Sequence, residues 1–174
     1  MKKILLGLWL TTMLVGCIEK EKVVEENWEV SPTFEVPVTF SDGTKGEYIL
    51  IGEEGKLGLF IGSGKEGEAE APPIMAKKVN KYMWHFWSEK EEWKGKLKVV
   101  GINEKGEEHK VLISHAGTPN SEKVWEYSEV RIIPHEAETK VPSNMEFPTP
   151  GLWKLKVYVG NRLFGEIVVN VLER

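Results

Sequence analysis

After residue 28, hydrophobic and polar residues alternate at every second position in one segment after another. The apolar side chains fall on even positions in Phe34–Phe40 and on odd positions in Trp153–Val159. Successive side chains of a β-strand point to opposite faces, so this period of two predicts strands with one buried and one solvated face. No segment of this part of the sequence carries a convincing helical stripe. The pattern therefore predicts an all-β protein.

Turn residues divide the alternating pattern into eight or nine short strands. Single strands are predicted at 34–40, at Lys81–Trp87 and at Val124–Ile133, and Pro37 marks the first as an edge strand because it lacks a backbone N–H donor. Trp153 is predicted to lie in the core. Three hairpins are predicted, each around a turn that contains glycine: Tyr48–Ile51 with Lys56–Ile61, Leu97–Asn103 with Glu107–His115, and Trp153–Val159 with Leu163–Leu172.

Two segments are predicted to be irregular. Residues 62–80, rich in Gly, Glu and Pro, form a long loop, and four prolines break the chain at positions 134, 142, 148 and 150. Many short strands separated by turns are typical of an antiparallel sandwich. The segment 150–158 and the hairpin after it resemble the closing strands of immunoglobulin-like domains. We expect an immunoglobulin-like antiparallel β-sandwich over residues 28–174, with a small β-barrel as the alternative.

The first seventeen residues have the composition of an export signal. Lys2 and Lys3 precede the mostly apolar stretch Ile4–Val15, which is too short to span a hydrocarbon core of about 30 Å comfortably. The sequence Leu-Val-Gly-Cys at 14–17 resembles the lipobox of bacterial lipoproteins. This resemblance implies that residues 1–16 are a cleaved signal peptide and that the Cys17 thiol carries diacylglycerol. The alternatives are a plain signal peptide or a membrane-anchoring helix with an incidental cysteine.

Cys17 is the only cysteine among 174 residues. One cysteine excludes a disulfide framework and any cysteine-rich zinc or iron–sulfur site. A free thiol is a liability in an exported protein, whereas a thioether to lipid is inert, which supports the lipoprotein interpretation. We expect no cofactor other than this covalent diacylglycerol and acyl lipid, of the palmitate type.

The mature chain carries a clear excess of acidic residues. Removal of residues 1–16 takes away two lysines, which leaves 21 basic and 27 acidic residues and a net charge near −6. A net acidic domain is a poor candidate for binding nucleic acid, or for binding anionic lipid through its body. Residues 17–27 are predicted to be a lipid-anchored acidic tether, and the ten residues after Cys17 span at most about 33–36 Å when extended. An extra N-terminal helix is the alternative.

No motif in the sequence predicts catalysis or metal binding, so no catalytic and no metal-ligating residue is expected. Gly62–Gly67 fits Gly-x-Gly-x-x-Gly, but acidic residues and prolines follow where a dinucleotide site needs a helix. His109 and His115 lie about 20 Å apart on one predicted strand, too far to share a metal. Ser114 and His115 point to opposite faces. We expect a non-enzymatic protein, with an envelope hydrolase or inhibitor as a lesser alternative.

The segment 82–87, Tyr-Met-Trp-His-Phe-Trp, places aromatic residues on both faces of one predicted strand. One face forms core, and the favoured interpretation is that residues 62–80 or 116–150 cover the other. An exposed tryptophan beside a histidine can instead stack on sugar rings or hold a peptide side chain. Trp84, His85 and Trp87 are therefore the ligand-binding candidates. Trp93 and Trp125 are further aromatic candidates, each expected to pin its loop to the sandwich.

The Leu-Val-Gly-Cys motif, the acidic tether, the segment KYMWHFW and the ending GLWKLKVYVGNRLFGEIVV together resemble uncharacterised small lipoproteins of bacilli, from about Trp28 to the C-terminus. The lipidation motif implies attachment to the outer face of the cytoplasmic membrane, and the Lys/Glu-rich style indicates a Gram-positive bacterium. The family assigns no activity and defines no oligomeric state.

From these features we expect a lipid-anchored binding or structural module of the cell envelope. Its partners would be the membrane, through the lipid, and an envelope protein or polysaccharide, with no nucleic acid. The alternative is a ligand-capturing lipoprotein whose site surrounds Trp84 and Trp87.

Overall fold

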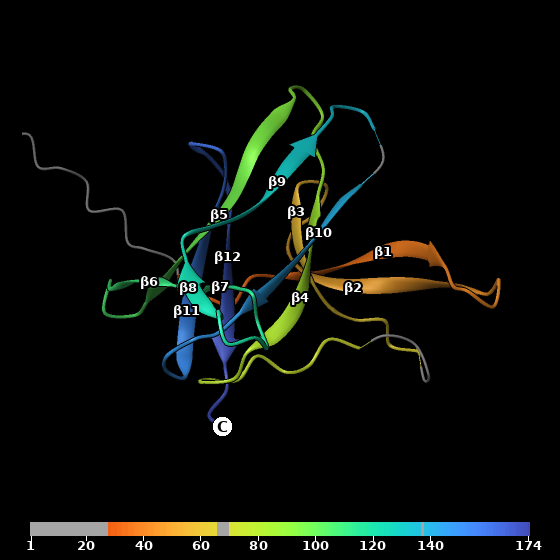
Figure 1. Cartoon of the computed structure of the whole chain (residues 1–174). Helices are drawn as coiled ribbons and strands as arrows, with labels where there is room; N and C mark the ends of the chain where they lie inside the picture. The colour runs from red at the N-terminus through yellow and green to blue at the C-terminus, as the bar shows by residue number, and fades with distance from the viewer. Residues whose placement is uncertain (1–27, 66–69, 137) are drawn as a thin grey trace, which may run out of the picture.

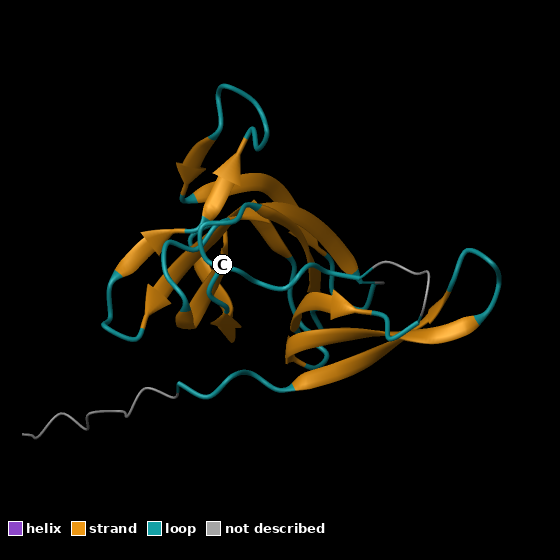
Figure 2. Cartoon of the chain, turned by 90° about the horizontal axis from the view of Figure 1, so that it is seen from below, coloured by secondary structure: helices purple, strands orange, loops and turns teal. Residues whose placement is uncertain are grey.

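The structure, a computed structural model, describes residues 28–65, 70–136 and 138–174, and it contains strands and loops but no helix there (Figure 2). The predicted signal peptide and tether, and Cys17 with them, lie outside the described residues. No helix in the described part is long and apolar enough to cross a membrane. The strands are β1 Thr33–Thr39, β2 Lys45–Glu53, β3 Leu57–Gly62, β4 Asn80–Phe86, β5 Trp93–Asn103, β6 Glu108–Lys110, β7 Leu112–Ser114, β8 Glu122–Val124, β9 Glu126–Ile132, β10 Thr139–Met145, β11 Gly151–Val159 and β12 Arg162–Val171.

The strands form two antiparallel sheets that face each other. One sheet has seven strands in the order β1-β2-β3-β4-β10-β7-β8, and the other has the order β12-β11-β5-β6 with β9 also paired to β5. In Figure 1 the tip of the β1–β2 hairpin extends away from β11 and β12, while the other end of β2 packs against β12. Over the described residues neither sheet closes into a barrel, so the sandwich is confirmed and the barrel alternative is wrong. The immunoglobulin-like assignment stays a prediction.

The core lies between the inward faces of the two sheets. Trp84 and Phe86 of β4 and Trp153 of β11 are completely buried there, and Phe147 meets Trp153 at 5.5 Å between ring centroids. The Trp153 indole is also satisfied as a donor, because its Nε1 donates to the carbonyl of Thr149 at 3.0 Å. The prediction that Trp153 is a core residue is confirmed.

The strand β5 pairs with β11 along one edge, over residues 97–103, and its other edge is divided between two partners. Residues 93–98 pair with β9, and residues 100–102 pair with β6. The predicted strand Glu107–His115 therefore divides at Val111, whose side chain is buried in the core, and continues as β7 in the other sheet. The predicted strand Val124–Ile133 divides in the same way at Trp125, into β8 and β9.

Prolines have different effects at two positions. Pro37 lies in β1, an edge strand of the seven-stranded sheet, as predicted. Pro142 was predicted to break the chain but lies inside β10, paired with Met83. Only residues 144 and 145 of β10 pair with β7, so the strand has one partner at Pro142 and the missing N–H donor can face the open edge.

Candidate functional site

Trp84 does not form an exposed aromatic platform. Its side chain points into the core with no exposed surface, and its Nε1 donates to Ser143 Oγ at 2.8 Å. Tyr82 and Phe86, on the same face of β4, are buried with it. The ligand-binding role considered for Trp84 is therefore corrected: the ring packs between the sheets because this face of β4 is the core face.

His85 lies on the outward face of β4 and is nonetheless 1% exposed. Phe60 stacks on its ring at 6.3 Å between centroids, and Trp87 lies tilted beside it at 6.0 Å. His85 Nδ1 donates to Glu138 Oε1 at 2.5 Å, and Lys140 Nζ lies 2.9 Å from the other carboxylate oxygen. These neighbours leave the imidazole no access to a ligand. The second face of β4 is covered at His85, but the rings that cover it are Phe60 and Trp87, outside the two segments 62–80 and 116–150 that were predicted to do so. Of those segments, 116–150 contributes Glu138.

The electrostatics of this pair favour a neutral imidazole beside a charged carboxylate. Burial lowers the pKa of His85 below its usual range, although the hydrogen bond and charge of Glu138 oppose the shift. Burial raises the pKa of Glu138, but the hydrogen bonds from His85 and Lys140 outweigh it and lower that pKa overall. A carboxylate only accepts hydrogen bonds, so the neutral His85 carries its proton on Nδ1.

We expect the protein to lose stability as the pH falls through about 6.5, the ordinary pKa of histidine. The unfolded chain takes up a proton there that the folded His85 resists, so the free energy of unfolding rises with pH in this range. Thermal or urea unfolding between pH 7.5 and 5.5, above the range of the carboxylates, measures the slope. His85→Gln should flatten it. Equal slopes in His85→Gln and the wild type would contradict this assignment.

Trp87 is the one ligand-binding candidate that reaches a surface pocket. It is half-buried and lines a hollow of about 440 Å³ at the end of the sandwich, here called the Trp87 pocket. Trp93 and Phe164 meet at 4.9 Å in its wall, and Arg162 lies 3.9 Å above the Trp93 ring. The remaining lining residues come from the β2–β3 turn and the β4–β5 loop: Glu53, Glu54, Gly55, Lys56, Ser88, Glu89, Lys90 and Glu91.

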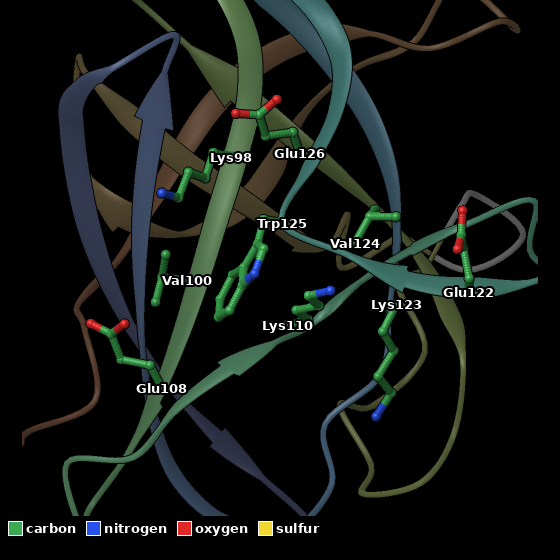
Figure 3. Close-up of a pocket in the computed structure, with 9 residues that line it drawn as sticks. All are labelled: Lys98, Val100, Glu108, Lys110, Glu122, Lys123, Val124, Trp125 and Glu126. Carbon is green, nitrogen blue, oxygen red and sulfur yellow. The ribbon is translucent and has the colours of Figure 1, made fainter.

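A larger pocket, of about 560 Å³, surrounds Trp125, where the chain returns from β8 to β9. We call it the Trp125 pocket. Figure 3 shows the indole between Val100 and Lys110, with Glu122 and Glu126 farther out. Lys110 Nζ lies 5.9 Å from the Trp125 ring centroid, and the carbonyl of Trp125 accepts a hydrogen bond from Val99 N at 3.3 Å. The other lining residues are Lys98, Glu108, Lys123 and Val124.

The titratable residues considered in the sequence do not converge on one point. Among residues 28–65, 70–136 and 138–174, no group of three or more His, Cys, Asp or Glu side chains could hold a metal ion. His109 packs edge-on against Trp153 at 5.2 Å, and its Nε2 and Ser114 Oγ are buried polar atoms without a hydrogen-bond partner. The Trp87 and Trp125 pockets are the hollows in the described part of the chain that a tryptophan side chain lines.

Fold and surface together place the chain in the class of small antiparallel β-sandwich domains. The chain belongs to the family described as "Domain of unknown function (DUF4871)", whose family model matches residues 18–169. The predicted resemblance to an uncharacterised family is thereby confirmed.

One solved structure that the chain resembles is described as "X-ray Crystal Structure of a Putative Lipoprotein from Bacillus anthracis". The two share 23% sequence identity and a TM-score of 0.57, over 84% of this chain and 88% of that chain. At this identity the likeness shows a common fold. No curated protein matches the chain.

Proposed function

We propose that the protein is a lipid-anchored, non-enzymatic binding module of the bacterial cell envelope, held on the outer face of the cytoplasmic membrane of a Gram-positive bacterium. The observation that carries the proposal is the Leu-Val-Gly-Cys motif, whose cysteine lies sixteen residues before the first strand of a folded sandwich. The description of the Bacillus anthracis structure as a lipoprotein supports the same location. Two or more acyl chains on Cys17, at about 0.8 kcal/mol per buried CH₂ group, anchor such a domain stably.

The start of the described chain is fastened to the sandwich. Ser31 N donates to the carbonyl of Val168 in β12 at 2.9 Å, and Val168 N donates to Ser31 Oγ at 2.9 Å. Gly52 N donates to the carbonyl of Pro32 at 2.9 Å. A pull on the tether is thus transmitted to β12, a strand of the main core. This arrangement suits a domain that is held by its N-terminal end.

The Trp87 pocket is where we propose that an envelope protein or polysaccharide binds. Its wall combines aromatic carbon with carboxylate and ammonium groups, the mixture that recognises sugar rings and peptide side chains. Trp87 keeps part of its surface exposed beside Ser88 and Lys90, whereas Trp84 and His85 are buried and take no part. Of the three ligand-binding candidates that the sequence indicated, the proposed site therefore keeps Trp87 alone.

Replacing Cys17 with serine should remove the protein from the membrane without unfolding it. Wild-type protein made in a Gram-positive host should enter the detergent phase on phase separation, because its acyl chains partition with detergent. Cys17→Ser protein that has been cleaved should stay in the aqueous phase and melt at the wild-type temperature. As a control, Cys17→Ser combined with Ser41→Cys keeps one thiol per chain, at an exposed position outside the motif, and should also stay aqueous. Cleaved Cys17→Ser protein in the detergent phase would refute the anchor.

A further inference from the structure

Lysine recurs at every second position on two neighbouring strands of the five-stranded sheet. On β5 these residues are Lys94, Lys96 and Lys98, and on β11 they are Lys154 and Lys156. Residues paired directly across a sheet share a face, and Lys156 pairs with Val100, which pairs in turn with Lys110 of β6. Leu97 and Val99 of β5 and Trp153, Leu155 and Val157 of β11, which alternate with these lysines, are buried in the core. All six lysines therefore lie on the outward side of this sheet, which we call the lysine face. Lys154 is only 5% exposed there, and the other five are half-buried or exposed.

The lysine face has the opposite charge to the protein as a whole. The register adds one arginine and four carboxylates to the six lysines, so that the face carries seven basic and four acidic side chains: Arg131, Glu108, Glu126, Glu129 and Glu166 are the additions. The mature chain has a net charge near −6. The excess of acid must lie elsewhere in the chain, which includes the acidic segment 17–27, so a net charge averaged over the chain does not describe this face.

Two of these lysines contact aromatic rings rather than carboxylates. Lys98 Nζ lies 5.4 Å from the ring of Tyr158, and Lys110 Nζ lies 5.9 Å from that of Trp125. Among the residues that the structure describes, neither ammonium group forms an ion pair. Both line the Trp125 pocket (Figure 3). Ammonium groups beside half-buried tryptophan and tyrosine are the combination found where proteins meet the headgroup layer of a membrane.

The chain also enters the sandwich on this face. Trp28, the first described residue, lies against Lys154, whose Nζ is 4.9 Å from the Trp28 ring centroid. The eleven residues 17–27 reach at most about 36–40 Å. A lipid on Cys17 therefore holds the lysine face within this distance of the bilayer, and the tether need not pass around the domain.

We infer that the lysine face lies against the anionic headgroups of the membrane that holds the lipid, with a headgroup phosphate taken up beside Lys98 and Lys110 in the Trp125 pocket. Charge complementarity and the entry of the chain at Trp28 both favour the membrane over a soluble anion. The inference rests on the proposed lipid anchor.

The test measures lysine acetylation, peptide by peptide, on mature protein purified from membranes and reconstituted in vesicles. One set of vesicles contains phosphatidylcholine alone, and the other contains about one-third phosphatidylglycerol. With phosphatidylglycerol, Lys98, Lys110 and Lys156 should react at least about fivefold more slowly, and the protection should disappear near 1 M salt, where screening acts over about 3 Å. Lys45 and Lys78, exposed residues outside the lysine face, should react equally in both.

Charge-reversal variants distinguish the contribution of the lysine face to membrane binding from the effect of the overall net charge. Lys98→Glu, Lys110→Glu and Lys156→Glu together should abolish the protection of Lys94 and Lys96 by phosphatidylglycerol. Lys45→Glu, Lys78→Glu and Lys81→Glu change the net charge equally and should preserve it. Thermal melts identify any triple variant that is unfolded, and single replacements then take its place.

Three results would overturn the inference: equal labelling in both lipids, protection of Lys45 and Lys78 instead, or protection only on addition of soluble poly(glycerol phosphate) to phosphatidylcholine vesicles. The last result would mean that the lysine face binds an anionic wall polymer and not the membrane. The intact mass of the same preparation reports lipidation separately. Unlipidated protein whose lysine face is still protected by phosphatidylglycerol would contradict the anchor and leave the docking surface supported.

Discussion

Replacing Trp153 with alanine is expected to lower the free energy of unfolding by about 3–5 kcal/mol. The ring is completely buried between the sheets, and Phe147 and His109 both meet it edge-on. Its removal leaves a cavity, and it also leaves the carbonyl of Thr149 without the indole donor. Both effects act in the same direction, so this substitution should be among the most damaging in the domain.

Urea unfolding followed by circular dichroism measures this loss. Trp125→Ala is the matched control, because Trp125 is only half-buried and lies over a surface pocket. Trp125→Ala removes the same side-chain atoms as Trp153→Ala, and it should lower the free energy of unfolding by less than half as much. A loss below about 1 kcal/mol for Trp153→Ala would show that the inward face of β11 is misassigned. If Trp153→Ala does not fold at all, Trp153→Phe provides a smaller cavity from which the same comparison can be made.

Alanine at Gly95 is expected to cost about 2–4 kcal/mol. Gly95 lies in β5 with φ of 140°, and a Cβ atom there would stand 2.6 Å from the Cα of Gly160 and 2.9 Å from its nitrogen. Gly160 lies in the β11–β12 turn, where its N–H donates to the carbonyl of Lys96 at 2.8 Å. The clash is with backbone on both sides, so it is relieved only if the turn moves away from β5.

Gly106→Ala separates the two causes of this loss. Gly106 also has a positive φ, of 78°, but nothing lies within 4 Å of the Cβ that alanine would add. It should therefore show the conformational strain alone, about 1 kcal/mol. Equal losses of stability in Gly95→Ala and Gly106→Ala would mean that the turn and β5 do not touch as described.

Many strands of this protein could be predicted from the sequence. A strand with one face in the core and one face in solvent has apolar and polar residues that alternate with a period of two. β1 and β11 follow from such patterns, whereas β2 and β3 were predicted as short apolar runs joined by a glycine-containing turn, and β4 from aromatic residues on both faces. The alternation reports which face is buried and not which strand is the neighbour. The division of residues 107–115 at Val111 was therefore not predictable, because it depends on β9 having taken part of the edge of β5.

The strand β10 shows a second limit of local patterns. Its Pro142 reads as a breaker, and only the open edge beside it in the folded sheet makes proline acceptable there. Such an edge is created by the chain elsewhere, since β7 is short and meets only the end of β10.

The candidate sites were predicted in part. The sequence placed Trp84 and Trp87 on opposite faces of one strand, but it could not tell which face the second sheet covers. The lysine face had a visible signal, since Lys94, Lys96, Lys98, Lys154 and Lys156 all alternate with core residues. The significance of that signal depends on β5 and β11 being neighbours, which only the register shows.

The mass of the N-terminal peptide of the mature protein, isolated from the membranes of its native host, tests the central claim most directly. The account predicts a chain that begins at Cys17, with diacylglycerol on the sulfur as a thioether. A mature chain that begins elsewhere, or one that begins at Cys17 with an unmodified thiol, would contradict it.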